Sequence, residues 1–115
     1  MEERQSPLYR MQAEMCKALA HPARLEIIDL IADKELAVSQ LLEVMNLAKA
    51  NLSQHLGVLR RAGILADRRE GVKVYYPLSH PQLAEACRLV RETLVRQLFQ
   101  AGELARKSGL RRTMP

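Results

Sequence analysis

The segment from residue 48 to 61 carries side chains that can read the edges of DNA bases if it forms a helix. At 100° per residue its leucines fall on one side, and small or polar residues fall on the opposite side. There, Gln54 can form the paired hydrogen bonds that recognise adenine, Ser53 can contact a base or a phosphate, and Ala50 can meet a thymine methyl group. An ordinary amphipathic helix with a hydrated face has the same pattern, so the neighbouring residues must decide between the two interpretations.

Positive charge is concentrated around this segment. Residues 48–77 carry six basic and two acidic side chains, whereas residues 1–47 carry five basic and eight acidic ones. Three of the six cations flank Glu70-Gly71, which predicts a turn between two strands. A basic hairpin beside a DNA-reading helix can contact the phosphate backbone, which positions a protein without conveying sequence. The candidate phosphate contacts are Lys49, Arg60, Arg61, Arg68, Arg69 and Lys73.

The composition disfavours catalysis and membrane insertion. The 115 residues include five glycines without a glycine-rich loop, and no Ser/His/Asp grouping stands out, so we expect no enzymatic activity and no cofactor. The polar N-terminus is unlike a signal peptide, and no run approaches the roughly 18 apolar residues that span a bilayer. We therefore expect no membrane partner and a cytoplasmic location, where the two cysteines stay reduced.

Apolar spacing predicts four helices in the first half of the chain. They cover residues 8–19, 23 to about 33, 39–45 and 48–61. The side chains predicted to face inward from the last three are Leu25, Ile28, Ile31 or Ala32, Leu41, Leu42, Met45, Leu52, Leu56 and Leu59.

Local start and stop signals support these helices. Ser6 is a predicted N-cap with Pro7 in the first turn, and Ser39 is a predicted N-cap of the third helix. Gly63 is suited to end the fourth helix, because glycine readily adopts the left-handed backbone of a helix C-terminus.

After Gly63 the hydrophobic period changes from helical to alternating. A strand begins at Ile64, and Val72, Val74, Tyr76 and Leu78 alternate with other residues, which predicts a hairpin with one buried face. A last helix is expected to begin at Ser79-His80-Pro81 and to run past Leu98. The predicted fold is mainly α with a small β-hairpin, a winged helix-turn-helix in the order α-α-α-α-β-β-α. We expect a flexible N-terminus over 1–7, a single domain over 8–106 and a basic flexible tail over 107–115.

The first and last helices each carry an apolar stripe, and the stripe of the last helix is long for so small a domain. Such a stripe needs a second helical surface to cover it, which favours a homodimer, although packing against its own domain is the alternative. The predicted dimer contacts are Leu8, Met11, Met15, Leu83, Cys87, Val90, Leu94 and Leu98.

Three stretches, in this order and spacing, resemble the ArsR/SmtB family of bacterial winged-helix repressors. They are KALAHPARLEII at 17–28, NLSQHLGVLRRAGI at 51–64 and RREGVKVYY at 68–76. The resemblance covers about residues 8–98. It implies a homodimer built from the first and last helices, which binds double-stranded operator DNA at an inverted repeat and leaves it when an inducer binds. Members often have serine at the positions of Ala48 and Ala50, so the chain departs from the family where the recognition helix begins.

The resemblance does not identify the inducer. Residues 36–42 lack the cysteine pair of the family's thiolate-type metal sensors, and Thr93 and Arg96 stand where the zinc-type sensors have ligands, so we expect no metal site. Cys16 on the first helix and Cys87 on the last are candidates for thiol sensing of oxidants or soft metalloids. The alternative is that both cysteines only pack at an interface.

Two other functions stay open at this point. A winged helix can serve as a protein-interaction module, and a DNA-binding regulator can lack any cysteine or metal sensing site. Phosphate contacts predict a steep loss of affinity with salt, which an apolar protein interface does not.

Overall fold

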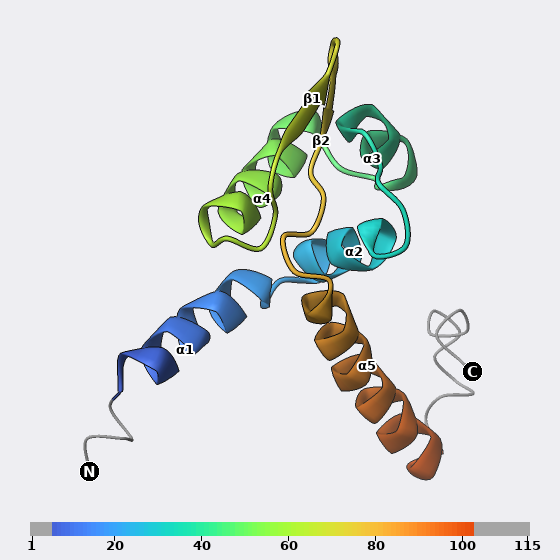
Figure 1. Cartoon of the computed structure of the whole chain (residues 1–115). Coiled ribbons are helices and arrows are strands. Elements are labelled where there is room, and N and C mark those ends of the chain that lie inside the picture. Colours follow the sequence, from blue (N-terminus) through green and yellow to red (C-terminus); the bar gives the residue numbers. More distant parts are fainter. Residues whose placement is uncertain (1–5, 103–115) are drawn as a thin grey trace. The chain divides into compact units, whose positions relative to one another are not determined.

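The structure, a computed structural model, describes residues 6–102 and confirms the predicted fold class. The described residues divide into two compact units, one ending at Pro81 and the other beginning at Gln82. The elements are α1 (Pro7–Leu19), α2 (Pro22–Ile31), α3 (Val38–Val44), α4 (Lys49–Arg61), β1 (Arg68–Glu70), β2 (Lys73–Tyr75) and α5 (Gln82–Gln100) (Figure 1). The predicted N-terminal segment, except for its last two residues, and the whole predicted tail lie outside the described residues.

Side-chain caps and prolines start the first two helices. The hydroxyl of Ser6 accepts a hydrogen bond from the Leu8 amide at 3.2 Å, and Pro7 occupies the first turn of α1, as predicted. Nδ1 of His21 accepts from the Ala23 amide at 3.1 Å, and Pro22 follows it at the start of α2. Each cap satisfies a backbone amide that a helix start leaves without a partner.

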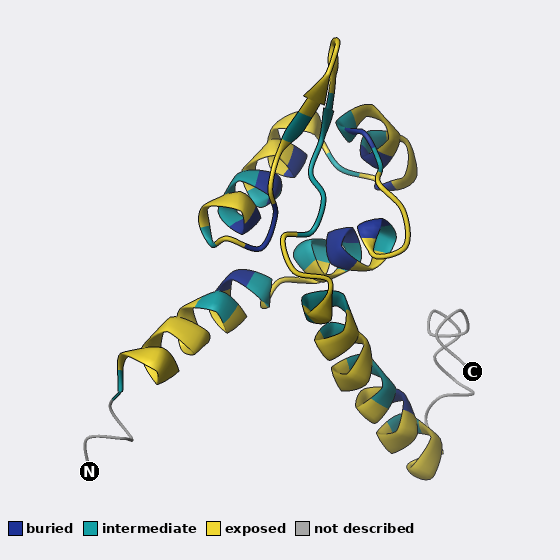
Figure 2. Ribbon diagram, viewed as in Figure 1, coloured by how far each residue is buried: buried dark blue, intermediate teal, exposed yellow. Residues whose placement is uncertain are grey.

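The core of the first unit lies between α2, α3 and α4, which carry most of the buried residues (Figure 2). Ile27 is fully buried, and Ile28 and Ile31 lie beside it on the same face of α2. The prediction for Leu25 was wrong, because this side chain is 41% exposed. At 100° per residue, Leu25 lies at the flank of the buried face, whereas Ile27 lies within it.

The third helix begins one residue earlier than predicted, and Ser39 is not its cap. The cap position is Ala37, whose amide donates to Oε1 of Gln40 at 2.8 Å. The Gln40 side chain therefore satisfies the amide of the cap residue, while the cap residue itself supplies no side-chain hydrogen bond to the helix. Leu41 and Met45 are buried as predicted, while Leu42 is half-buried.

The two strands pair antiparallel, with Arg69 opposite Val74 and Glu70 opposite Lys73. The turn lies at Gly71-Val72, one residue later than predicted, and Gly71 has a φ of +62° that favours glycine. Val72 was predicted on the buried face but is 98% exposed, because it stands at the tip of the hairpin beyond any packing partner.

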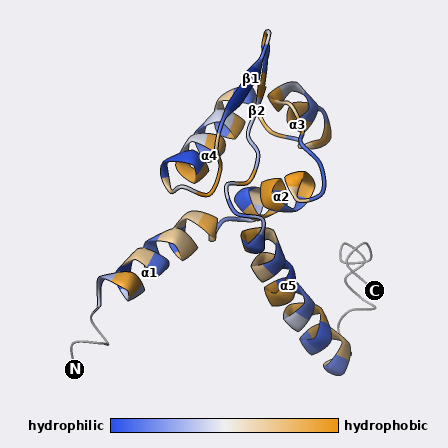
Figure 3. Ribbon diagram, in the orientation of Figure 1, coloured by the Kyte–Doolittle hydropathy of each residue, from blue (hydrophilic) through white to orange (hydrophobic). Residues whose placement is uncertain are grey.

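The hairpin is tied to the helices at its base. An isolated bridge joins Ala37 to Tyr75, and β2 contacts α3. A second bridge joins Leu65 to Leu78 below the strands. We call residues 68–75 the wing; β1 is hydrophilic along its length (Figure 3).

The second unit consists, over its described residues, of α5 and a short turn after it. Arg88 forms ion pairs with Glu85 and Glu92 along one side of the helix. Val90 and Leu94 of the predicted stripe are exposed within the chain.

Candidate nucleic-acid interface

A helix-turn-helix places α4 with one face in the core and the other in solvent. Leu52, Leu56 and Leu59 are 0–2% exposed and anchor α4, while Ser53 and Gln54 on its outer side are exposed, as is Ala50. The turn between α3 and α4 is short and is fixed by a hydrogen bond from the Leu47 amide to the Met45 carbonyl at 2.8 Å. This is the arrangement that presents the second helix of a helix-turn-helix to the DNA major groove.

The start of α4 has no side-chain cap. Ala48 occupies the cap position without a side-chain hydrogen bond, as its residue type requires. The first turn, Lys49 to Asn51, is exposed. Amides at an uncapped helix start suit a phosphate oxygen when a polyanion approaches.

A groove of about 750 Å³ lies between α3, α4 and the wing. Five basic side chains and no acidic one line it. We call it the basic groove. Its lining includes six of the nine residues predicted to contact DNA: Lys49, Ser53, Arg60, Arg61, Arg69 and Lys73. Ala50 and Gln54 are not among its lining residues.

Gly57 lets the guanidinium of Arg61 lie against α4 in this groove. A Cβ atom built on Gly57 would meet Nη1 of Arg61 at 3.1 Å, so a larger residue would have to displace the guanidinium. Arg61 forms no ion pair with any residue between 6 and 102, which leaves its charge available to a phosphate.

The remaining predicted contact, Arg68, is engaged inside the protein. Its guanidinium bonds to the carboxylate of Glu35, pairs with Glu70 at 3.2 Å and lies 4.4 Å from the centre of the Tyr75 ring. The hydrogen bond to Glu35 is the main cause that raises the pKa of Arg68 above its ordinary value. Arg68 therefore fastens the wing to the loop after α2. No local pattern predicts this pairing, because Glu35 lies 33 residues from Arg68 along the chain.

His55 of α4 contacts Arg24 and His21 at the start of α2. Nε of Arg24 donates to Nδ1 of His55 at 3.2 Å, and the rings of His21 and His55 are 4.5 Å apart between their centres. Burial, and then the charges of His21 and Arg24, hold the pKa of His55 below its ordinary value of 6.5. The neutral imidazole is the form that accepts from Arg24. Both histidines have a structural role here, and among residues 6–102 no three potential ligands gather to hold a metal ion.

The cysteines and the apolar stripe divide between the two units. Cys16 on α1 is exposed and Cys87 on α5 is half-buried, and neither is in a disulfide. Thiol sensing by these two cysteines stays a prediction. On α1, Leu8 and Met11 are more than two-thirds exposed, and Met15 is half-buried.

No helix in the described part of the chain is long and apolar enough to cross a membrane.

Comparison with known proteins agrees with this geometry. A helix-turn-helix domain family model matches residues 19–68. The uncharacterized HTH-type transcriptional regulator Rv0081 of Mycobacterium tuberculosis is 45% identical over 93 residues, which are 80% of this chain and 82% of that protein. The transcriptional repressor PagR of Bacillus anthracis is 34% identical over 79 residues, 68% of this chain and 79% of that protein.

Solved structures extend the likeness to three dimensions. The crystal structure of M. tuberculosis Rv0081 matches with a TM-score of 0.73 at 43% identity, over 84% of this chain and 97% of that one. The solution structure of Mb0332 from Mycobacterium bovis, a homodimeric winged helix-turn-helix DNA-binding domain of a possible ArsR-family transcriptional regulator, matches with a TM-score of 0.74 at 32% identity. That match covers 83% of this chain and 88% of the Mb0332 fragment. With this degree of identity over most of its length, the chain belongs to the ArsR family of winged helix-turn-helix transcriptional regulators.

Proposed function

We propose that the protein is a homodimeric repressor that binds an inverted-repeat operator through α4 and the wing. The observation that carries this proposal is the basic groove, in which five cations and no acid line one hollow next to the exposed polar face of α4. A surface of one sign of charge beside a helix that can enter the major groove is the electrostatic footprint of a DNA-binding protein.

The proposed contacts are of two kinds, those that recognise base edges and those that bind phosphates. Gln54 reads an adenine edge, Ser53 contacts a base or a phosphate, and Ala50 packs on a thymine methyl. The cations of the basic groove bind phosphates and set the register of the protein on the duplex. Arg68 contributes less than the other cations, because two carboxylates already neutralise its charge. The groove cations are Lys49, Arg60, Arg61, Arg69 and Lys73.

The exposed apolar residues of α1 and α5 support a homodimer. Leu8, Met11 and Val90 are each more than two-thirds exposed in the single chain, and Leu94 is about half exposed. Covering them in a two-fold dimer removes this surface from water and pairs the two α4 helices for half-sites about one helical turn apart. We infer that bound dimers block transcription by occupying the operator, in the cytoplasm where such DNA lies.

The proposal is tested by titrating the protein into a fluorescently labelled duplex of its own upstream DNA, followed by anisotropy, with a scrambled duplex of equal composition as reference. We expect preferential binding of the upstream duplex and protection of two symmetric half-sites in a footprint. The variant Leu94→Glu should be monomeric by light scattering and should bind poorly. A dimeric Leu94→Glu would refute the interface, and equal affinity for both duplexes would refute sequence-specific repression.

The signal that releases the protein is proposed to act on its thiols. Cys16 is exposed on α1, so an oxidant or As(III) in solution can reach it. Treatment with peroxide or As(III) should weaken operator binding of the reduced protein, and a Cys16→Ser, Cys87→Ser double variant should not respond. If the double variant responds equally, or if the wild type does not respond, the cysteines only pack and the inducer is of another chemical class.

A further inference from the structure

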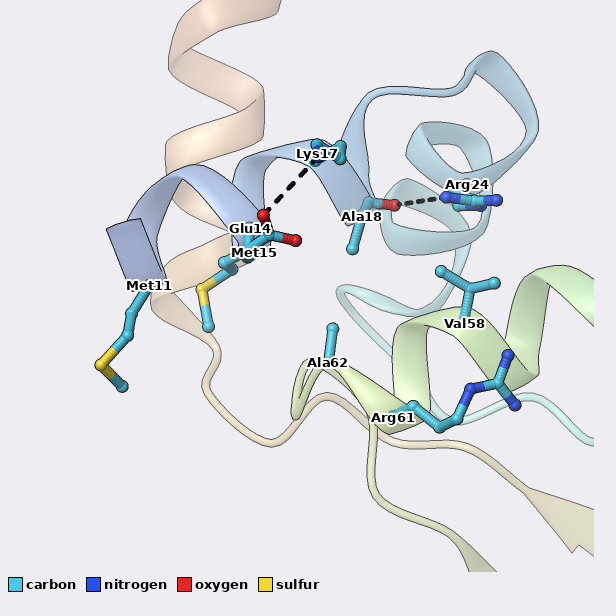
Figure 4. A pocket seen from close by; sticks show the side chains of 9 residues that line it. All are labelled: Met11, Glu14, Met15, Lys17, Ala18, Arg24, Val58, Arg61 and Ala62. Carbon is cyan, nitrogen blue, oxygen red and sulfur yellow. Dashed lines mark hydrogen bonds and ion pairs between the residues drawn. The ribbon is translucent and has the colours of Figure 1, made fainter. Parts of the chain in front are cut away.

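A second hollow, of about 590 Å³, lies on another side of α4, between α1, α2 and α4 (Figure 4). Its size is within the roughly 300–1,000 Å³ of ligand pockets in proteins. The proposed DNA contacts use only one of its residues, Arg61. The side chains that line it are Met11, Glu14, Met15, Lys17, Ala18, Arg24, Val58, Arg61 and Ala62.

The walls of this cavity combine an apolar interior with positive charge. Ala18 is buried, and Met15, Val58 and Ala62 are half-buried, so they offer an apolar surface to a ligand. Methionine side chains adapt their shape to different ligands. Three basic side chains and one acidic one also line the cavity, and the acidic one, Glu14, is paired with Lys17 at 3.6 Å. The net effect is a cation-rich rim around an apolar hollow.

Arg24 is held in place at this rim without a carboxylate partner. Nη1 donates to the Ala18 carbonyl at 3.1 Å (Figure 4). Nε donates to Nδ1 of His55 at 3.2 Å. The guanidinium thus has a fixed position, and it pairs with no acid among the described residues. A fixed guanidinium with unused donors beside an apolar surface is suited to bind the carboxylate or sulfonate of an amphipathic molecule.

Arg61 connects the cavity with the basic groove, because it lines both. Its guanidinium lies over Gly57, and the side chain forms no ion pair within residues 6–102. An anion in the cavity and a DNA phosphate in the groove would therefore compete for the same positive charge.

We propose that this cavity binds an amphipathic organic anion, whose apolar body packs on Met15, Val58 and Ala62 and whose acidic group pairs with Arg24 and Arg61, and that its binding lowers DNA affinity. The proposed binding of the anion depends only on the residues of the cavity. The proposed effect on DNA affinity also rests on the proposed function. Met11 and Met15 also belong to the proposed dimer stripe, whereas the inner wall of Ala18, Val58 and Ala62 does not.

Calorimetry with the full-length protein tests the site directly. The probes are decanoate, below its micelle-forming concentration, and 1-anilinonaphthalene-8-sulfonate, with decylamine and decanol as matched probes of other charge. We expect saturable binding of the two anions and at least tenfold weaker binding of decylamine and decanol. If neither anion binds, or if decylamine binds as well as decanoate, the proposal is wrong.

Two variants locate the binding. Ala62→Phe places an aromatic ring in the cavity where the apolar body would pack, and Arg24→Met removes the fixed charge. Each should weaken anion binding at least tenfold. Their thermal midpoints and circular dichroism are compared with those of the wild type, because Arg24 also braces α4. Lys34→Met, an exposed charge that does not line the cavity, is the matched control and should bind as the wild type does. Undiminished binding by a folded Ala62→Phe variant would place the anion elsewhere and overturn the site.

The coupling to DNA is measured by anisotropy with the upstream duplex. Saturating decanoate should lower the DNA affinity of the wild type several-fold and leave that of Ala62→Phe unchanged. If the anion binds in the cavity but no duplex is bound specifically, the ligand site stands and the proposed function fails. If DNA binds specifically and decanoate binds without changing its affinity, the coupling through Arg61 is wrong. Anion binding by monomeric Leu94→Glu alone would show that a second copy occupies the cavity, which also overturns the proposal.

Discussion

The inner and outer faces of α4 follow different rules although they belong to the same thirteen residues. The inner face is a run of leucines with 0–2% exposure, and any apolar side chain of matching volume would serve the packing. The outer face carries Ser53 and Gln54, which are exposed and therefore contribute little to folding. In α4, the residues that stabilise the fold are therefore different from the residues that would give preference for a DNA sequence.

The largest effect should come from the inner face. Leu59 is fully buried, so Leu59→Ala should lower the free energy of unfolding by about 2–5 kcal/mol through lost contacts and a residual cavity. Urea denaturation followed by circular dichroism measures this change. Ser53→Ala on the outer face is the matched control and should shift stability by less than about 0.5 kcal/mol. Equal destabilisation by both variants would contradict the division between the faces.

The outer face should govern selectivity. Gln54→Ala should reduce the preference for the upstream duplex over the scrambled one by about 1–3 kcal/mol, because a bidentate base contact is lost. Competition anisotropy measures this preference. Gln12→Ala, an exposed glutamine on α1, serves as the control with the same chemical change. A uniform loss of affinity for both duplexes would assign Gln54 to the backbone instead of a base.

Substitution of a phosphate-binding cation should change DNA binding in a different way from substitution of a base-contacting residue. Lys73→Ala removes one cation of the basic groove from each protomer, so binding to both duplexes should weaken alike and the salt slope should become shallower by about one unit per protomer. The control is Lys17→Ala, which removes the same charge from α1 outside that groove. An identical slope for the Lys73 and Lys17 variants would remove the wing from the phosphate contacts.

The smallest expected effect is the pH dependence of stability that His55 of α4 causes. Because the pKa of His55 is lowered in the folded state, the unfolded chain binds more protons in the window just below pH 6.5. Stability is therefore complete above pH 6.5 and is lost as the pH falls through the lowered pKa of His55. His55→Gln keeps an acceptor for Arg24 but does not titrate.

Thermal midpoints between pH 5 and pH 8 check this prediction. The wild type should lose stability toward acid faster than His55→Gln does, and His80→Gln, an exposed histidine, should behave as the wild type. Parallel curves for the wild type and His55→Gln would show that another group controls the acid response.

Local signals in the sequence predicted the helices that position the candidate site. The Ser6-Pro7 start of α1 and the leucine spacing of α4 depend on near neighbours, and both are confirmed. Gly63 ends α4 with a φ of +79°, which its residue type foretells. Short-range geometry of this kind is encoded within a few residues and can be read without the fold.

The errors came from details of a cap and a turn that residue type alone does not specify, and from one contact between residues far apart in the sequence. Ser39 is a better N-cap by residue type than Ala37, but the reach of the Gln40 side chain decided the start of α3. Val72 fits an alternating strand, yet the turn left it in solvent. The pairing of Arg68 with Glu35 required the fold to bring the wing to the loop after α2, so no spacing rule could predict it.

Binding of the DNA backbone by the basic groove is tested by the salt dependence of the affinity for the upstream duplex. Anisotropy titrations at several salt concentrations between about 50 and 200 mM give the slope of log affinity against log salt. If each of the five groove cations neutralises a phosphate, the slope should be about −4.5 for one protomer and about −9 for the homodimer. A slope near zero would contradict the account and would favour a winged helix that binds a protein partner.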